Sequence, residues 1–157
     1  MKYIYILLLT VSVSLSSCSN SAVDKINVSI TFIPSGGGES GYAIDIKDSI
    51  FVVSEKVLDI GDDGFILTSN LATNECVLKD NQVKKIIELL NDIQDFEGRL
   101  RDLNQEVTNV WDITICFDGK EAIFVDTLLL IEKEEFKQIK EFIDYIIEIS
   151  PLDIVMD

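Results

Sequence analysis

The chain of 157 residues contains no histidine and few basic side chains, with 13 lysines and arginines against 28 aspartates and glutamates. The absence of histidine excludes a Ser-His-Asp triad, a Cys-His dyad and any histidine-ligated zinc or haem site. A formal net charge of −15 argues against nucleic acid as a partner, because a phosphate backbone must be met by lysine and arginine. We therefore expect neither histidine chemistry nor a nucleic-acid partner.

Proline and cysteine are also scarce, with two prolines and three cysteines, whereas apolar residues make up 47% of the chain. A chain of this length and composition can bury a core without disulfide bonds, and it is not typical of intrinsic disorder. Its length predicts one ordinary folded domain. We divide the sequence into a signal peptide (1–17), a short polar tether (18–25) and a single domain (26–157).

The first eighteen residues have the three parts of a secretory signal. Lys2 precedes an uncharged, mostly apolar stretch that ends at Leu15, and small residues then lead to Cys18. The segment Leu15-Ser16-Ser17-Cys18 resembles the lipobox of bacterial lipoproteins. The resemblance implies cleavage before Cys18, lipidation of its thiol and attachment to the cell envelope by that lipid. The alternative is an ordinary signal peptide that is cleaved at another bond.

The residue after the lipidated cysteine bears on localisation. In the usual sorting of lipoproteins in bacteria with two membranes, an aspartate there retains the protein in the inner membrane, but this chain has Ser19. The acidic run that directs some lipoproteins to the cell surface is absent from Ser19 to Val23. The resemblance therefore implies the outer membrane, on the side that faces the periplasm.

The sequence after the tether begins with segments that alternate between apolar and polar residues, a pattern typical of half-buried strands. The Gly-rich segment 34–41 and the pair Asp48-Ser49 are the expected turns of an antiparallel meander. The acidic segment 59–64 is expected to be a loop. The pattern predicts strands over 26–33, 42–47 and 50–57, with weaker signals over 65–68 and 75–78.

Two helices are predicted, each from a single apolar stripe at helical spacing. The first covers about 81–94 after Asp80 as N-cap, and the second covers 133–149 before Pro151. Between them, 111–117 and 121–127 are predicted strands joined by a type I′ turn at Asp118-Gly119. The predicted fold class is α+β, an antiparallel sheet with two amphipathic helices (about 81–94 and 133–149) packed on one face.

The body of the chain resembles small secreted bacterial lipoproteins of unknown function. The likeness lies in the helix from Asp80 to Gln94, the hairpin from Trp111 to Lys120 and the closing helix before Ser150-Pro151. It covers most of residues 40–151 and implies no activity.

Two motifs are interpreted as loops and not as ligand sites. The segment Gly36 to Gly41 matches G-x-G-x-x-G, but a strand follows it where a dinucleotide fingerprint requires a helix. The segment Asp59 to Gly64, compared with an EF-hand loop, lacks one early ligand and the bidentate glutamate. We therefore predict no cofactor and no dedicated metal site.

Cys76 and Cys116 are the two thiols that remain if Cys18 is lipidated. The oxidising envelope allows a disulfide between them, provided that their Cα atoms lie within about 7 Å, and two unpaired thiols are the preferred interpretation. A catalytic cysteine is not predicted, because no histidine is present to form the thiolate and acidic surroundings raise a thiol pKa.

Aromatic and acidic side chains are the other candidates for a functional site. Trp111 and Tyr42 are typical of binding surfaces, although core packing is preferred for Trp111, which shares a face with Ile113. The acids at Glu132–Glu135 and Glu141–Asp144 lie among lysines at helical spacing. We expect these acids to form a solvated surface and not the carboxylate pair of a glycosidase.

These observations predict a lipid-anchored envelope lipoprotein that is not an enzyme. Its expected role is that of a binding module for another envelope protein or a ligand. The alternative is an acidic inhibitor or immunity protein against a basic envelope hydrolase or toxin, because a negative surface accelerates association with a basic target.

Overall fold

The structure, a computed structural model, describes residues 25–62, 64–100, 110–120, 122–127, 130 and 133–156. The predicted signal peptide and Cys18 lie outside these residues. The strands are β1 (Asn27–Pro34), β2 (Ser40–Lys47), β3 (Ile50–Gly61), β4 (Gly64–Val77), β5 (Gly98–Arg99), β6 (Trp111–Phe117) and β7 (Ile123–Asp126). The helices are α1 (Asp80–Ile93) and α3 (Lys137–Glu148), with a short 3-10 helix, η1 (Glu134–Phe136), directly before α3.

Six strands form an antiparallel sheet in the order β4-β3-β2-β1-β6-β7, and the short β5 extends it in parallel with β7. The α+β class is therefore confirmed, as is the meander of the first three strands. β1 lies at the centre, where Ile30 pairs with Ile44 of β2 on one side and with Ile115 of β6 on the other. The strand closest to the tether thus joins the two halves of the chain.

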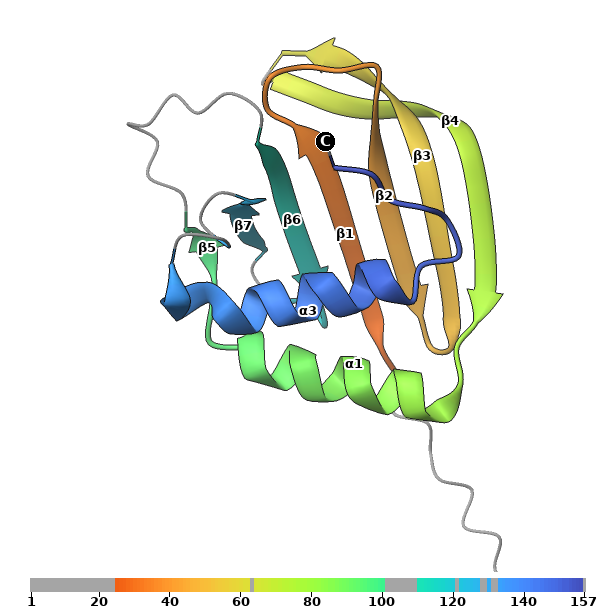
Figure 1. Cartoon of the computed structure of the whole chain (residues 1–157), viewed down its shortest axis with the longest axis vertical. Helices are drawn as coiled ribbons and strands as arrows, with labels where there is room; N and C mark the ends of the chain where they lie inside the picture. The colour runs from red at the N-terminus through yellow and green to blue at the C-terminus, as the bar shows by residue number, and fades with distance from the viewer. Residues whose placement is uncertain are drawn as a thin grey trace, which may run out of the picture.

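A single cluster of buried side chains connects the sheet to both helices. Alternate residues of the central strands, such as Ile30 and Phe51, have exposed fractions of 0%, and so do Ile86 of α1 and Phe142 of α3. In Figure 1, α3 crosses the central strands and α1 runs beside it at the lower end of the molecule. Burial of this apolar surface is the main force that holds helices and sheet together.

The hairpin between β6 and β7 forms as the sequence predicts. Asp118 and Gly119 have φ angles of +49° and +68°, the two positive values that a type I′ turn requires. Glycine adopts such an angle without strain, and aspartate tolerates it better than most residues. The returning strand is shorter than predicted, since β7 covers only Ile123–Asp126.

Two local predictions are wrong. The segment 59–64 is not an open acidic loop, because β3 continues to Gly61 and pairs with β4 from Gly64 onward. β4 is likewise one long strand and not two short ones. Cross-strand pairs of apolar residues, Leu58 with Leu67 and Ile60 with Phe65, account for this extension.

The N-cap of α1 is also one residue earlier than predicted. Lys79 has the extended cap conformation, and its backbone N–H donates a hydrogen bond of 2.9 Å to Oε1 of Gln82. Asp80 is therefore the first helical residue. Its carboxylate still lies beside the positive end of the helix dipole, which explains why an acidic residue suits this position.

The Gly-rich connection between β1 and β2 makes room for the distal part of the β3–β4 hairpin. A Cβ atom on Gly41 would lie 2.8 Å from Cδ2 of Leu67, and one on Gly37 would lie 3.2 Å from Cζ of Phe65. The backbone N–H of Leu58 also donates a hydrogen bond of 3.1 Å to the carbonyl of Glu39. These contacts account for glycine at positions 37 and 41.

Candidate functional site

One pocket lies between the start of β6, the middle of α3 and the C-terminal residues. It has a volume of about 320 Å³, which is at the lower end of the range for small-molecule sites. We call it the Trp111 pocket, and it is lined by Trp111, Ile113, Thr127, Leu130, Lys140, Ile143, Asp144 and Met156.

The wall of the Trp111 pocket is fixed by the sheet. The backbone N–H of Trp111 donates a hydrogen bond of 3.1 Å to Oγ1 of Thr127, which ties the start of β6 to the residue that follows β7. The indole is half-buried, and its ring centre lies 6.0 Å from that of Tyr42 with the planes tilted by 31°. An aromatic pair of this kind holds the indole in place while leaving part of its surface open.

The C-terminal segment closes one side of the pocket. Its backbone N–H at Val155 donates a long hydrogen bond of 3.4 Å to the hydroxyl of Tyr42, and Ile154 beside it is buried. Upstream, Nδ2 of Asn74 donates a hydrogen bond of 3.2 Å to the carbonyl of Pro151. Met156 reaches the pocket because these contacts hold the segment across the sheet.

The floor and the rim of the pocket differ in polarity. Ile113 and Ile143 are almost fully buried, with exposed fractions of 1% and 2%. At the rim, Nζ of Lys140 donates to Oδ2 of Asp144 one helical turn later, and both side chains are well exposed. The arrangement is an apolar cavity with one ion pair at its mouth, which suits binding of an apolar group.

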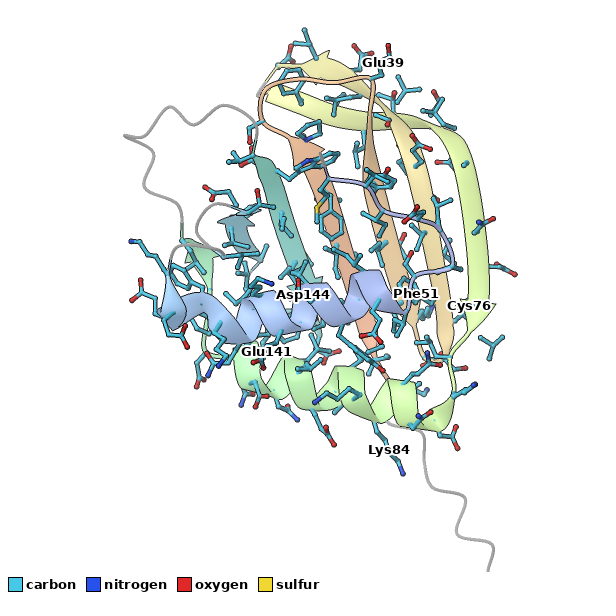
Figure 2. All side chains as sticks on the ribbon, viewed as in Figure 1. Glu39, Phe51, Cys76, Lys84, Glu141 and Asp144 are labelled. Carbon is cyan, nitrogen blue, oxygen red and sulfur yellow. The ribbon has the colours of Figure 1, made fainter. Side chains whose placement is uncertain are left out.

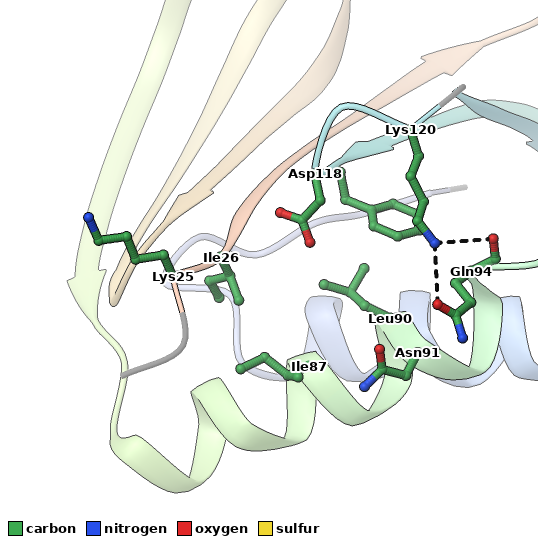
Figure 3. A pocket seen from close by; sticks show the side chains of 9 residues that line it. Lys25, Ile26, Ile87, Leu90, Asn91, Gln94, Asp118 and Lys120 are labelled. Atoms are coloured by element: carbon green, nitrogen blue, oxygen red, sulfur yellow. Dashed lines mark hydrogen bonds between the residues drawn. The ribbon is translucent and has the colours of Figure 1, made fainter. Parts of the chain in front are cut away.

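A second pocket, of about 220 Å³, lies between α1 and the β6–β7 turn (Figure 3). Nζ of Lys120 bridges to Gln94, donating to its side-chain oxygen at 3.3 Å and to its carbonyl at 3.5 Å. The same ammonium lies 5.5 Å from the ring centre of Phe117. We call this second pocket the Lys120 pocket, and it is lined by Lys25, Ile26, Ile87, Leu90, Asn91, Gln94, Phe117, Asp118 and Lys120.

The two cysteines lie far apart and on opposite faces of the sheet. Cys76 of β4 pairs with buried Phe51 and packs against the core (Figure 2), whereas Cys116 of β6 pairs with exposed Ser29. Four strand spacings of about 4.8 Å each separate β4 from β6. Both thiols are free, and this placement argues against the disulfide. Burial raises the pKa of Cys76, so this thiol is poorly suited to act as a nucleophile.

The acidic side chains of the closing helix lie on its surface. Figure 2 shows Glu141 and Asp144 on α3, and both are exposed. Glu134 of η1 forms an ion pair with Lys137 at 3.7 Å, while Glu132 lies outside the described residues. This part of the prediction, a solvated surface of acids and lysines, agrees with the structure. Burial, with the charge of Glu148, raises the pKa of Tyr145 on the same helix.

Some residues of the Trp111 pocket were candidates from the sequence and others were not. Trp111 and Tyr42, singled out separately, are brought into contact, and Trp111 lines a pocket as well as touching the core. Lys140 and Met156 were missed, because neither lies in a motif and both reach the pocket only through tertiary packing. Within the described ranges, no three His, Cys, Asp or Glu side chains gather closely enough to hold a metal ion.

In the part of the chain that the structure describes, no helix has the length and apolar character needed to cross a bilayer. Comparison with protein-family models, curated proteins and solved structures finds no match to this chain.

Proposed function

We propose that the chain is a lipid-anchored envelope lipoprotein whose folded part is a non-catalytic binding module. The anchor is supported by the lipobox, Leu15-Ser16-Ser17-Cys18, and by the short polar tether that leads from it to β1. Two or more acyl chains give stable attachment, since each buried CH₂ contributes about 0.8 kcal/mol. The expected location is the outer membrane, facing the periplasm.

The anchor is tested by metabolic labelling of the full chain with radioactive palmitate. We expect label in the wild type and none in Cys18→Ala, which should also shift from the membrane to the soluble fraction. A wild type that is unlabelled and soluble, with its leader removed beyond Cys18, would contradict the proposal.

The binding function rests on one observation, the Trp111 pocket. Its floor is apolar, its mouth carries the Lys140–Asp144 ion pair, and no further ionisable side chain lines it among the described residues. General acid–base or nucleophilic catalysis needs groups held together in a dry site. A small ligand with an apolar body and one polar group at the rim fits this lining better than a substrate that is cleaved.

The neutral fluorophore N-phenyl-1-naphthylamine tests the pocket, because Trp111 is the only tryptophan in the chain. We expect saturable quenching of Trp111 emission by energy transfer to the bound probe. Ile143→Phe should fill the pocket and weaken binding about tenfold, whereas Ile87→Phe, the same exchange at the Lys120 pocket, should leave it unchanged. Equal affinity in all three proteins would contradict the assignment.

Both helices are further proposed to cover the same face of the sheet. This is supported by the strand register, which puts the buried residues Val28, Ile44 and Val53 on one face, and by the membership of both helices in their cluster. The opposite face, which includes exposed Ser29 and Asp45, is then free to bind a partner. Asp45→Cys should react rapidly with a charged thiol reagent in cells whose outer membrane has been permeabilised, whereas position 29 is unsuitable because a cysteine there would lie opposite Cys116.

A second function, inhibition of a basic hydrolase or toxin of the envelope, is favoured by the excess of acids. Removal of residues 1–17 leaves 12 basic against 28 acidic side chains. Association with a basic target would be fast and sensitive to salt. Assays of the purified chain against basic envelope hydrolases at two ionic strengths test this function, and a lack of inhibition at low salt would exclude it.

A further inference from the structure

The most exposed apolar side chains gather on the β3–β4 hairpin. Eight large apolar residues of the described chain are exposed, and four of them lie between positions 60 and 71. The largest exposed fraction, 79%, belongs to Ile60, followed within the turn region by Ile66 at 48% and Phe65 at 37%. Single exposed apolar residues are normal, but a concentration of them on one element marks an interaction surface.

We propose that the hairpin tip, residues 59–62 and 64–66, is the contact surface for a basic protein. The inference rests on the second of the two proposed functions and adds the place where the partner binds. It is independent of the Trp111 pocket.

The charge of the hairpin selects this class of partner. From Leu58 to Asn70 the sequence contains three acids and no basic residue. Asp59 and Asp62 are both exposed beside the apolar side chains, and Glu39 lies at the same upper end of the molecule (Figure 2). An apolar centre surrounded by carboxylates complements an apolar surface surrounded by lysine and arginine.

Two other occupants fit less well. An anionic bilayer would repel the three carboxylates, because acidic lipids attract basic and not acidic segments. A second copy of the chain would bring two sets of like charges together, which costs free energy at an interface. Both remain measurable outcomes of the experiment below.

Packing and a hydrogen bond hold the hairpin at and beside its tip, so that binding would order few additional groups. Phe65 packs against Gly37 of the β1–β2 connection and Leu67 against Gly41 of β2, and Oγ1 of Thr68 donates a hydrogen bond of 3.2 Å to the carbonyl of Val57. The register of β3 with β4 shifts on both sides of Lys56, as expected for β-bulges, which bend a hairpin and increase its twist. A preorganised surface loses less entropy when it binds.

The position of the tip agrees with a tethered protein. Figure 1 shows the β3–β4 turn at the upper end of the long axis and the start of β1 at the lower end. A lipid attached before β1 would therefore leave the tip at the end of the molecule away from that attachment. The surface would be accessible to a partner in the aqueous compartment.

Site-specific photocrosslinking tests the proposal with the full, anchored chain in its native bacterial host. p-Benzoylphenylalanine replaces Ile60 or Ile66, and in matched controls it replaces Val77 or Val155, which are also exposed. We expect a covalent adduct from the two tip positions only, with a protein that mass spectrometry identifies as basic. The double variant Asp59→Asn with Asp62→Asn should lower the yield of adduct about tenfold. The control double variant Glu135→Gln with Glu141→Gln changes the net charge by the same amount and should not lower the yield.

Several results would overturn the proposal. These are the absence of an adduct, equal adducts from Val77, an acidic partner, a crosslinked dimer of the chain or an adduct with lipid. An equal loss of yield in the Glu135 and Glu141 control would show that overall charge, and not the tip, attracts the partner. Inhibition of a basic hydrolase at low salt is assayed without crosslinking, so failure of the tip assignment is distinguishable from failure of the second proposed function.

Discussion

Gly41→Ala tests whether the β3–β4 hairpin is folded back over the β1–β2 connection as described. A Cβ atom at Gly41 would lie 2.6 Å from the carbonyl oxygen of Phe32 and 2.8 Å from Cδ2 of Leu67. The first neighbour is backbone of the central strand and cannot move away by a rotamer change. The added methyl therefore has to displace either the β1–β2 pairing or the hairpin.

Overpacking of this kind costs about 1–3 kcal/mol of unfolding free energy. With a urea m-value of about 2 kcal/mol/M, a cost of about 2 kcal/mol lowers the unfolding midpoint by about 1 M. Emission of Trp111, the only tryptophan, reports the transition. Because the hairpin base is also disturbed, crosslinking from Ile60 should fall together with stability.

Gly38→Ala, in the connection just before β2, is the matched control. Its Cβ atom would meet only a side-chain atom of Pro34 at 3.2 Å as its closest neighbour. Here the smaller entropy of the unfolded alanine chain offsets the contact, so the midpoint should change little. A Gly41→Ala protein as stable as the wild type, or no less stable than Gly38→Ala, would refute the close approach of Phe32 and Leu67 to Gly41.

Three further predictions concern thiols, core and surface. If Cys18 is lipidated as proposed, the unfolded chain should show two reactive thiols without reductant, and the absence of any reactive thiol would indicate a Cys76–Cys116 disulfide. In the folded state Cys76 should be alkylated slowly, at a rate that increases as pH rises towards its raised pKa. Ile86→Ala should lower the unfolding free energy by about 2–5 kcal/mol in urea titrations, because Ile86 has an exposed fraction of 0%. A loss below about 1 kcal/mol would mean that α1 is not packed on the core. Lys140→Ala should cost only about 0.3–0.5 kcal/mol, since its ion pair with Asp144 is exposed, and the difference should disappear in high salt.

The regular elements were predictable because their residues carry their own periodicity. β6 covers Trp111–Phe117 as its alternation predicts, and α1 and α3 agree with the predicted helices to within one residue at their starts and ends, once η1 is added to α3. The type I′ turn at Asp118-Gly119 was also predictable, since few residue pairs accept two positive φ angles. The prediction of a loop over the acidic segment 59–64 was wrong, because its apolar neighbours pair across the hairpin and extend both strands.

The candidate sites were less predictable, because they join residues that are distant in the sequence. Trp111 was recognisable as an aromatic residue on an alternating strand, but Lys140, Ile143 and Met156 meet it only when α3 and the C-terminal segment are in place. The predicted lipid attachment at Cys18 is the opposite case, since the lipobox that predicts it is a linear motif and needs no tertiary structure to be found.

Composition and local pattern thus determined the α+β class, the positions of the helices and the exclusion of histidine chemistry, because these depend on residue type and on spacing over a few residues. Only the tertiary structure decided that β1 is central, that Cys76 and Cys116 lie on opposite faces, and that Ile60 and Ile66 remain exposed at the end of the hairpin. The physical reason is that strand order, burial and pocket shape depend on contacts between distant segments, which no short stretch of sequence specifies.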